Sequence, residues 1–297
     1  MMDNSVDFLS TTRRREVECV RKWAKRCSHL PFAEHGFSIL VRVFNGRETH
    51  SILFDTGNSP NGVVINAKRM GVDLTEIEGV VLSHGHYDHF GGLKTIVKVI
   101  NKDNLPIITH EDMFKLRGVA EHDGSIRKYP AFPTEEEVKP ARYIKTKQPL
   151  LVDDMILITG EIPRKTSFEK GYSKHRIFSN GTWRSDPWIW DDRALVINVK
   201  QKGLMILSGC AHAGIINTTL YAQQLTGVNT IYAILGGLHL AGKENERRIN
   251  QTVEGLKSLK PRLLAPSHCT GWRGMFKLSN ALPDALVWNS VGNLYRL

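Results

Sequence analysis

His84-Gly85-His86-Tyr87-Asp88-His89 places three histidines and one aspartate within six residues, directly after the apolar run Gly79-Val80-Val81-Leu82-Ser83. If the chain stays extended through His86, the two-residue period of a strand points His84 and His86 to the same side. Two neutral imidazoles on one side can bind a single metal ion. A tight turn after Tyr87 then brings Asp88 and His89 toward a second position, about 3.5–4 Å away as in two-metal sites. The stretch predicts a metal site rather than a surface loop that happens to be rich in histidine.

Runs typical of strands and helices alternate around this stretch. The glycine pair Gly91-Gly92 gives the backbone freedom to fold back before the next helix. Helices are predicted over Gly62–Met70, Leu93–Ile100, Ile215–Leu225 and Glu244–Leu259. Strands are predicted over Phe37–Phe44, Ser51–Phe54, Gly79–Leu82, Ile107–Thr109, Met155–Thr159, Ala194–Val199, Leu204–Leu207, Ile231–Leu235 and Arg262–Ala265. The pattern alone indicates a mixed α and β protein.

The histidine stretch resembles the HxHxDH signature of the metallo-β-lactamase superfamily. Asp55-Thr56-Gly57 resembles the first motif of that superfamily, and His268 resembles its last metal-binding histidine. Three segments resemble the dihydropteroate synthase-like branch: residues 208–214, 236–240 and 268–271. The resemblance implies an α/β (α+β) fold, a four-layer αββα sandwich of two mixed β-sheets flanked by helices. It covers residues 37–297 and leaves residues 1–36 as an N-terminal basic helical extension.

The resemblance implies a metal centre, and the chain departs from the family pattern at two positions. Cys210 stands where a bridging aspartate is usual, and it either coordinates or only packs as a small thiol. Asp191-Asp192 stands where a further histidine is usual, and His212 can supply that imidazole instead. The implied ligands are His84, His86, Asp88, His89, Cys210, His212 and His268. They would hold one or two divalent ions, with zinc favoured and manganese, iron or magnesium as alternatives.

Asp88 and His239 are the candidate catalytic residues. In a hydrolase, Asp88 would orient a metal-held water. His239 follows a glycine pair, and three roles remain open for it. It can bind the metal, hydrogen-bond a metal ligand or contact the substrate, and the last two roles are favoured. Asp55 is expected to orient a ligand or a loop backbone. Three other histidines are expected to be mostly solvated: His110, His122 and His175.

Composition indicates a compact enzyme that acts on anionic molecules. The chain has 297 residues, 41% of them hydrophobic, and a formal net charge of +10. Lys and Arg are scattered among acidic residues, which favours a phosphorylated small molecule over nucleic acid as the partner. No apolar run approaches the ~18 residues of a membrane span, and the four cysteines lack a CxxC pair, so we expect a cytoplasmic protein without a membrane partner. Residues 12–27 predict a basic amphipathic helix that packs on the body or at a contact with a second copy. Binding to a membrane surface is the minor alternative, because the apolar face is narrow.

The segment from Ile162 to Trp190 lies between predicted strands and mixes cations with aromatic side chains. Long loops in compact domains are commonly lids or binding loops. Cations can bind phosphate, and aromatic rings can stack on a flat heterocycle. The tentative substrate residues are Arg164, Lys165 and Arg176. The alternative is a loop whose aromatic side chains only pack against one another.

Three functions remain open from the sequence. The branch resemblance implies a transferase that joins a dihydropterin-methyl diphosphate to an aminobenzene ribofuranosyl 5′-phosphate and releases diphosphate, as in methanopterin-type biosynthesis. The superfamily default is a metal-dependent hydrolase of a phosphoester or related ester. A non-catalytic metal or redox protein would explain the missing bridging aspartate, but the HxHxDH stretch is intact.

Overall fold

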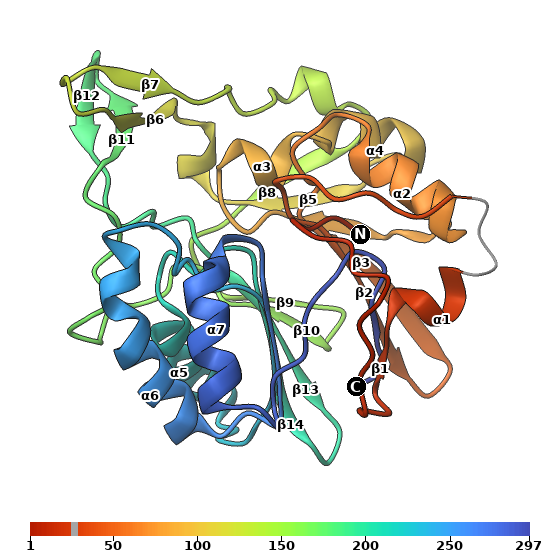
Figure 1. Ribbon diagram of the computed structural model, residues 1–297. Coiled ribbons are helices and arrows are strands. Elements are labelled where there is room, and N and C mark those ends of the chain that lie inside the picture. The colour runs from red at the N-terminus through yellow and green to blue at the C-terminus, as the bar shows by residue number, and fades with distance from the viewer. Residues whose placement is uncertain (25–28) are drawn as a thin grey trace.

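Two mixed β-sheets form the centre of the molecule in the computed structural model, which describes residues 1–24 and 29–297 (Figure 1). The first sheet has the strand order β2-β3-β4-β5-β8, and the second has the order β16-β15-β14-β13-β10-β9. The first comprises β2 (Ile39–Asn45), β3 (Glu48–Phe54), β4 (Gly79–Val81), β5 (Pro106–Thr109) and β8 (Arg142–Lys145). The second comprises β9 (Leu150–Val152), β10 (Ile156–Ile158), β13 (Ala194–Val199), β14 (Gly203–Ser208), β15 (Ile231–Gly237) and β16 (Leu263–Ser267).

Helices cover the outer face of each sheet. The helices are α1 (Val20–Ala24), α2 (Gly62–Met70), α3 (Tyr87–Phe90), α4 (Leu93–Ile100), α5 (Ile215–Thr226), α6 (Ile249–Leu259) and α7 (Gly271–Ala281). Short 3-10 turns are η1 (Leu74–Glu76), η2 (Glu111–Phe114), η3 (Glu136–Val138), η4 (Asn245–Arg248) and η5 (His268–Thr270). No helix among the described residues combines the length and apolar character that crossing a bilayer requires.

Three apolar clusters hold these layers together. One lies between the two sheets and includes Phe54 and Val81 of the first sheet and Leu207 of the second. Another joins the first sheet to α2 and α4, and the third joins the second sheet to α5, α6 and α7. Apolar surface on both faces of each sheet accounts for the nearly continuous apolar runs of the central strands. The four-layer αββα sandwich that the resemblance implied is confirmed.

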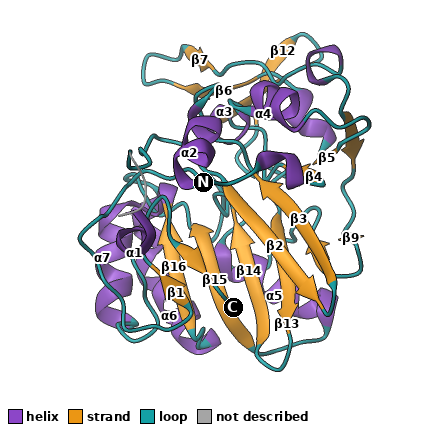
Figure 2. Cartoon of the chain, turned by 90° about the vertical axis from the view of Figure 1, so that its right-hand side faces the viewer, coloured by secondary structure: helices purple, strands orange, loops and turns teal. Residues whose placement is uncertain are grey.

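Parallel pairing brings the carboxyl ends of the central strands together. In the first sheet β3, β4 and β5 are parallel neighbours, and in the second β14, β15 and β16 are. Figure 2 shows the latter three side by side, with their arrowheads toward the same end of the sheet. Ligands of open α/β sheets bind beyond the carboxyl ends of the strands. The histidine stretch follows β4, and the loops after β14, β15 and β16 carry Cys210, His239 and His268.

A third sheet stands beside the sandwich, with the order β12-β11-β6-β7. Its strands are β6 (Arg117–Ala120), β7 (Ile126–Lys128), β11 (His175–Ser179) and β12 (Thr182–Ser185). Figure 1 places it at the edge of the molecule, away from α5 and α6. The reading of Ile162–Trp190 as a long loop is therefore wrong over this hairpin, because β11 pairs with β6, a strand distant in sequence.

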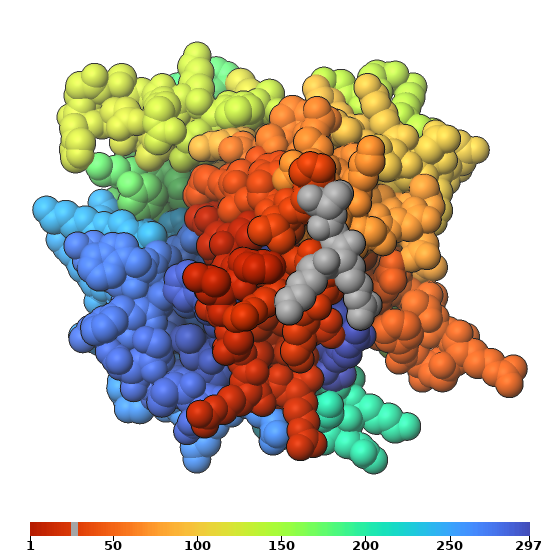
Figure 3. All heavy atoms as spheres, turned by 45° about the vertical axis from the view of Figure 1, so that its right-hand side comes forward, coloured from red at the N-terminus to blue at the C-terminus, as the bar shows by residue number. Residues whose placement is uncertain are grey.

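The N-terminal segment is incorporated into the body. β1 (Val17–Glu18) pairs with β17 (Leu294–Tyr295), and only Val20–Ala24 is helical. The prediction of a single helix over residues 12–27 is therefore wrong before Val20, because residues 17 and 18 pair with the last strand. Residues 25–27 of that prediction lie outside the described part of the chain. Met2 packs into the cluster under the first sheet. Figure 3 shows the red N-terminal residues between the orange and blue parts of the surface.

Candidate metal centre

The histidine stretch leaves β4 and enters α3 with His86 as the last extended residue, at φ −94° and ψ 142°. The tight turn expected after Tyr87 is the first turn of this short helix. Glycines 91 and 92 have ordinary negative φ values, so the prediction that they supply backbone freedom is wrong. They are needed because carbonyl oxygens of Asn58 and Thr56 occupy the space that a Cβ would take.

Replacing Gly91 by alanine should therefore destabilise the fold next to the histidine stretch. The added methyl group would overlap the Asn58 carbonyl, and overpacking of this kind costs about 1–3 kcal/mol. Chemical denaturation should show a lower midpoint. Gly79→Ala is the control, because its nearest neighbour, the Pro106 Cγ, lies at an ordinary contact distance of 3.4 Å. Equal stability of the two variants would contradict this reading.

Three imidazoles converge at the first candidate metal position. His84 Nε2 lies 3.0 Å from His86 Nδ1 and 3.2 Å from His212 Nε2. All three side chains are buried. Burial, together with the neighbouring imidazoles, lowers the pKa of each ring well below its usual value. The rings are thus neutral, which is the form that binds metal.

A second group of donor atoms surrounds Asp88. Asp88 Oδ2 lies 3.2 Å from His268 Nε2, 3.2 Å from His35 Nε2 and 3.8 Å from His89 Nε2. Cys210 Sγ lies 3.2 Å from His89 Nε2, so it shares this position. Burial alone would raise the pKa of Asp88, but the neighbouring His89, His268 and His35 imidazoles lower it well below its usual value. The carboxyl group is therefore an anion, as a ligand must be.

Hydrogen bonds fix which nitrogen of each ring is free. His89 donates from Nδ1 to Asp55 Oδ2 at 2.7 Å, since a carboxylate only accepts. The Ser83 hydroxyl donates to Asp55, so it accepts from His84 Nδ1 at 2.9 Å. His268 Nδ1 donates to Asn4 Oδ1 at 3.0 Å. The Nε2 lone pairs of the three rings therefore point inward, an arrangement typical of metal-binding histidines.

Among the buried nitrogens without a hydrogen-bond partner in the described part of the chain, two belong to candidate ligands, His86 Nε2 and His268 Nε2. Buried polar atoms are otherwise almost always paired. His268 Nε2 faces the Asp88 carboxylate across 3.2 Å. Neutral rings, oriented tautomers and the unpaired His268 Nε2 together fit a divalent metal ion.

The aspartate pair in place of the usual histidine connects site loops instead of facing the cluster. Asp191 binds Arg117 through two hydrogen bonds of 2.6 and 2.9 Å and accepts from the Gly85 N–H at 2.7 Å. Asp192 accepts from the Ala213 N–H at 2.8 Å. Burial raises the pKa of Asp192 to about 6, whereas Arg117 outweighs burial and lowers that of Asp191 to about 2. The pair thus positions the backbone on both sides of the first position.

His239 lies at the edge of this cluster. Its ring centroid is 4.2 Å from that of His212, and burial and the Arg248 guanidinium lower its pKa well below the usual value. His175 of β11 lies 5.0 Å from His86 and 5.3 Å from His212 between ring centroids. The prediction that His175 and His110 are solvated is wrong, because both side chains are buried. His110 also forms a hydrogen bond with Glu161. His122 is exposed, as expected.

The side chains of the three proposed substrate residues bind other groups of the protein. Arg164 donates to the carbonyls of Ile162, Trp188 and Ile189, and its guanidinium lies 5.0 Å from the Trp190 ring centroid. These bonds close the base of the segment and leave Arg164 little capacity to bind phosphate. Lys165 bonds Gln224, and Arg176 bonds the carbonyls of Ser173 and His175.

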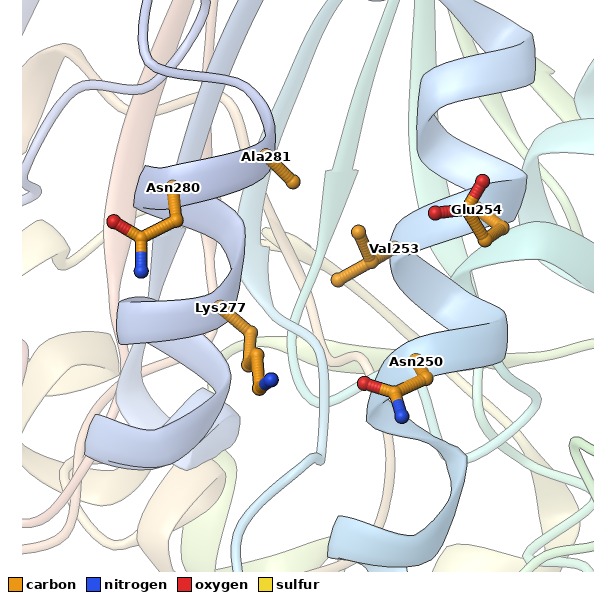
Figure 4. Close-up of a pocket in the computed structure, with 6 residues that line it drawn as sticks. All are labelled: Asn250, Val253, Glu254, Lys277, Asn280 and Ala281. Atoms are coloured by element: carbon orange, nitrogen blue, oxygen red, sulfur yellow. The ribbon is translucent and has the colours of Figure 1, made fainter.

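Two surface hollows lie outside the cluster. One of about 310 Å³ lies between α6 and α7 and is drawn in Figure 4. The other, of about 620 Å³, is lined by Arg15, Glu16, Gln201, Lys202, Tyr232, Arg262 and Arg296. Neither contains a histidine or cysteine of the candidate metal centre.

Sequence reasoning assigned no role to several residues at the centre. His35, which bonds Asp88, and Asn4, which bonds His268, come from the N-terminal segment. Neither has a local signal, because both reach the site through tertiary packing. Cys269 could have been recognised from the sequence, because it directly follows the predicted ligand His268 within the segment 268–271 that resembles the family.

Comparison with known proteins agrees with this geometry. The family profile described as the metallo-beta-lactamase superfamily matches residues 32–163. The chain is 34% identical over 254 residues to the 7,8-dihydropterin-6-methyl-4-(beta-D-ribofuranosyl)-aminobenzene-5'-phosphate synthase of Methanocaldococcus jannaschii, covering 82% of this chain and 83% of that one. An uncharacterized protein of the same archaeon is 31% identical, covering 89% of this chain and 93% of its own.

A solved structure extends the likeness to the fold. The crystal structure of a metal-dependent hydrolase of the beta-lactamase superfamily superposes with a TM-score of 0.74 at 22% sequence identity. The match covers 99% of this chain and 96% of that one. With its four-layer fold and its similarity to the M. jannaschii synthase over most of both sequences, the chain belongs to the metallo-β-lactamase superfamily.

Proposed function

We propose that this chain is a metal-dependent transferase that joins a (7,8-dihydropterin-6-yl)methyl diphosphate to an aminobenzene ribofuranosyl 5′-phosphate. The observation that carries the proposal is the 34% identity to the M. jannaschii synthase across 83% of that protein. The cluster of metal-binding side chains at the strand ends supports it, because a diphosphate leaving group requires neutralisation of its charge.

His84, His86 and His212 would hold one metal ion, and Asp88, His89, Cys210 and His268 a second. A bound divalent ion supplies a Lewis acid that stabilises negative charge on the diphosphate. Zinc suits the nitrogen and sulfur donors best, while manganese, iron and magnesium remain alternatives.

The reaction forms one bond and breaks one. The arylamine nitrogen bonds to the pterin methylene carbon, the carbon–oxygen bond to diphosphate breaks, and the nitrogen loses a proton. The half-buried His239 imidazole is neutral at pH 7 because its pKa is lowered, so one of its ring nitrogens can accept that proton. Asp88 would keep its charge and orient the groups around the second position.

Aromatic side chains beside the cluster suit a flat ring. Tyr129 packs edge-on to His86 at 5.4 Å between centroids, and Tyr87 lies 5.5 Å from Tyr129. Such rings offer stacking faces to a pterin. Lys165 and Arg176 remain the proposed contacts for the ribose phosphate. A cytoplasmic location also remains a prediction.

An assay with defined substrates tests the proposal. The zinc-loaded chain is incubated with both pathway substrates, with each substrate alone, and separately with a panel of phosphodiesters and esters. Diphosphate release that requires the arylamine, with equal amounts of joined product, supports the transferase. Cleavage of the panel without joining would favour a hydrolase, the second candidate function of a superfamily member. Turnover of neither would favour a non-catalytic metal protein.

Cys210→Ser should distinguish a sulfur ligand from a packing thiol. If the thiolate coordinates, the variant loses more affinity for zinc than for manganese, because sulfur favours zinc. Competition with a chromophoric chelator measures both dissociation constants. Equal losses for the two metals, or no loss, would mean that Cys210 only packs beside His89.

A further inference from the structure

Cys269 lies beside Cys210 at the second candidate metal position. Cys210 Sγ, one ring nitrogen of His268 and Cys269 Sγ all lie within 4.8 Å of one another. Two thiolates about 2.3 Å from one tetrahedral zinc ion are about 3.8 Å apart, which falls inside that limit. The two thiols reach one place from different loops, after β14 and after β16.

The backbone leaves room for this second thiol. Gly237, near the end of β15, has the Cys269 sulfur 2.7 Å from the place where a Cβ would lie, and the Gly209 carbonyl closer still. Any side chain at Gly237 would thus displace either the thiol or the neighbouring loop. A glycine in a buried strand commonly marks such a close approach.

Strained backbone surrounds the same sulfur atoms. Ala211, His239 and His268 have φ values of 54°, 44° and 50°, in the left-handed region that non-glycine residues rarely adopt. Each such residue costs on the order of 1–3 kcal/mol and persists only where its surroundings hold it, commonly at functional sites. All three lie next to or between the candidate ligands, which indicates that the loops are held in position for the donor atoms.

The Cys269 thiol contacts only groups around the same candidate position. It donates to the Cys210 carbonyl across a long 3.6 Å, and its sulfur also interacts with the Cys210 thiol and the His239 backbone. Thiols are weak donors, so this contact adds little to stability. His268 Nε2, on the neighbouring residue, is one of the buried nitrogens that have no hydrogen-bond partner among the described residues. A weakly bonded sulfur and an unpaired nitrogen thus lie close together.

We propose that Cys269 is a metal ligand, so that Cys210 and Cys269 form a thiolate pair which makes the second position selective for zinc or iron(II) over manganese and magnesium. On metal binding both thiols lose their protons to solvent, and two sulfur–metal bonds form. Soft thiolate donors disfavour manganese and magnesium, which prefer oxygen ligands. The inference rests on the proposed function only in requiring a bound metal.

Cobalt(II) substitution tests the thiolate pair, because thiolate–cobalt bonds give a near-ultraviolet charge-transfer band. The unmodified chain should show this band. Cys269→Ser and Cys210→Ser should each reduce it to about half, and the double variant should abolish it. Cys19→Ser is the matched control, since Cys19 is also a buried free cysteine but lies beside α1, and it should leave the band unchanged. Cys27→Ser is a second control.

A band unchanged in Cys269→Ser and abolished in Cys210→Ser would overturn the proposal. If Cys269→Ser does not fold, zinc-edge X-ray absorption of the unmodified chain counts sulfur atoms at about 2.3 Å directly. Because the signal averages over both metal positions, an average of one sulfur per zinc with two zinc ions bound supports the pair, and an average of one half or less overturns it. Neither readout uses a substrate. A chain that fails to join the two substrates can therefore still show the thiolate pair, and a chain without the pair can still join them.

Discussion

His86→Ala should empty the first metal position and reduce the proposed joining activity below detection while the fold persists. His86 Nδ1 lies 3.0 Å from His84 Nε2, and its removal leaves two imidazoles where three converge. The variant loses a ligand without adding a buried charge, so the surrounding loops keep their bonds to Asp191 and Asp55. Metal analysis by mass spectrometry and far-ultraviolet circular dichroism measure the two outcomes.

His122→Ala is the control for this variant. His122 is exposed between β6 and β7, so its removal should alter neither metal content nor activity. Full metal content in His86→Ala would contradict the assignment of His86. Loss of metal from His122→Ala would indicate that histidines bind metal elsewhere on the surface.

Asp191→Asn should produce the largest loss of stability. Asp191 and Arg117 are both buried and joined by two hydrogen bonds, so neutralising Asp191 leaves the buried Arg117 with the more distant Asp186, at 3.7 Å, as its charged partner. Breaking such a pair costs about 3–5 kcal/mol. Urea unfolding measures this difference. Lys94→Met, which removes the exposed partner of Glu137, is the control and should cost no more than about 1 kcal/mol.

The same pair predicts a pH dependence. The pKa of Asp191 is lowered in the fold to about 2 from an ordinary 3.8, so its stabilisation is fully present above about pH 4 and is lost as the pH falls toward 2. Asp191→Asn should remove this part of the acid dependence. Identical slopes of stability against pH for the variant and the unmodified chain between pH 4 and 2 would contradict the role given to the pair.

Local sequence patterns were sufficient for the central layers. The helices Gly62–Met70 and Leu93–Ile100 and the strand Ala194–Val199 have the predicted bounds, because each is bounded by turn residues and has an apolar face. The histidine stretch was found for the same reason, since its residues are adjacent in the chain. Patterns that are complete within about ten residues can be recognised without tertiary information.

The third sheet was missed because its strands are short and polar. β7 and β12 have mostly exposed or half-exposed side chains, so no alternation of apolar residues marks them. Pairing of β11 with β6 places His175 against His86, and no property of residue 175 alone predicts that contact. Arg164 was read as a phosphate ligand from its charge, whereas the structure assigns its donors to backbone carbonyls.

The most direct test of the metal centre is anomalous X-ray diffraction, at the zinc edge, from crystals of the zinc-loaded chain. The account predicts a peak about 2.0–2.3 Å from His84 Nε2, His86 Nδ1 and His212 Nε2. A second peak is expected among Asp88, Cys210 and His268. A well-ordered histidine stretch without an anomalous peak, or zinc bound only at surface residues, would contradict the account.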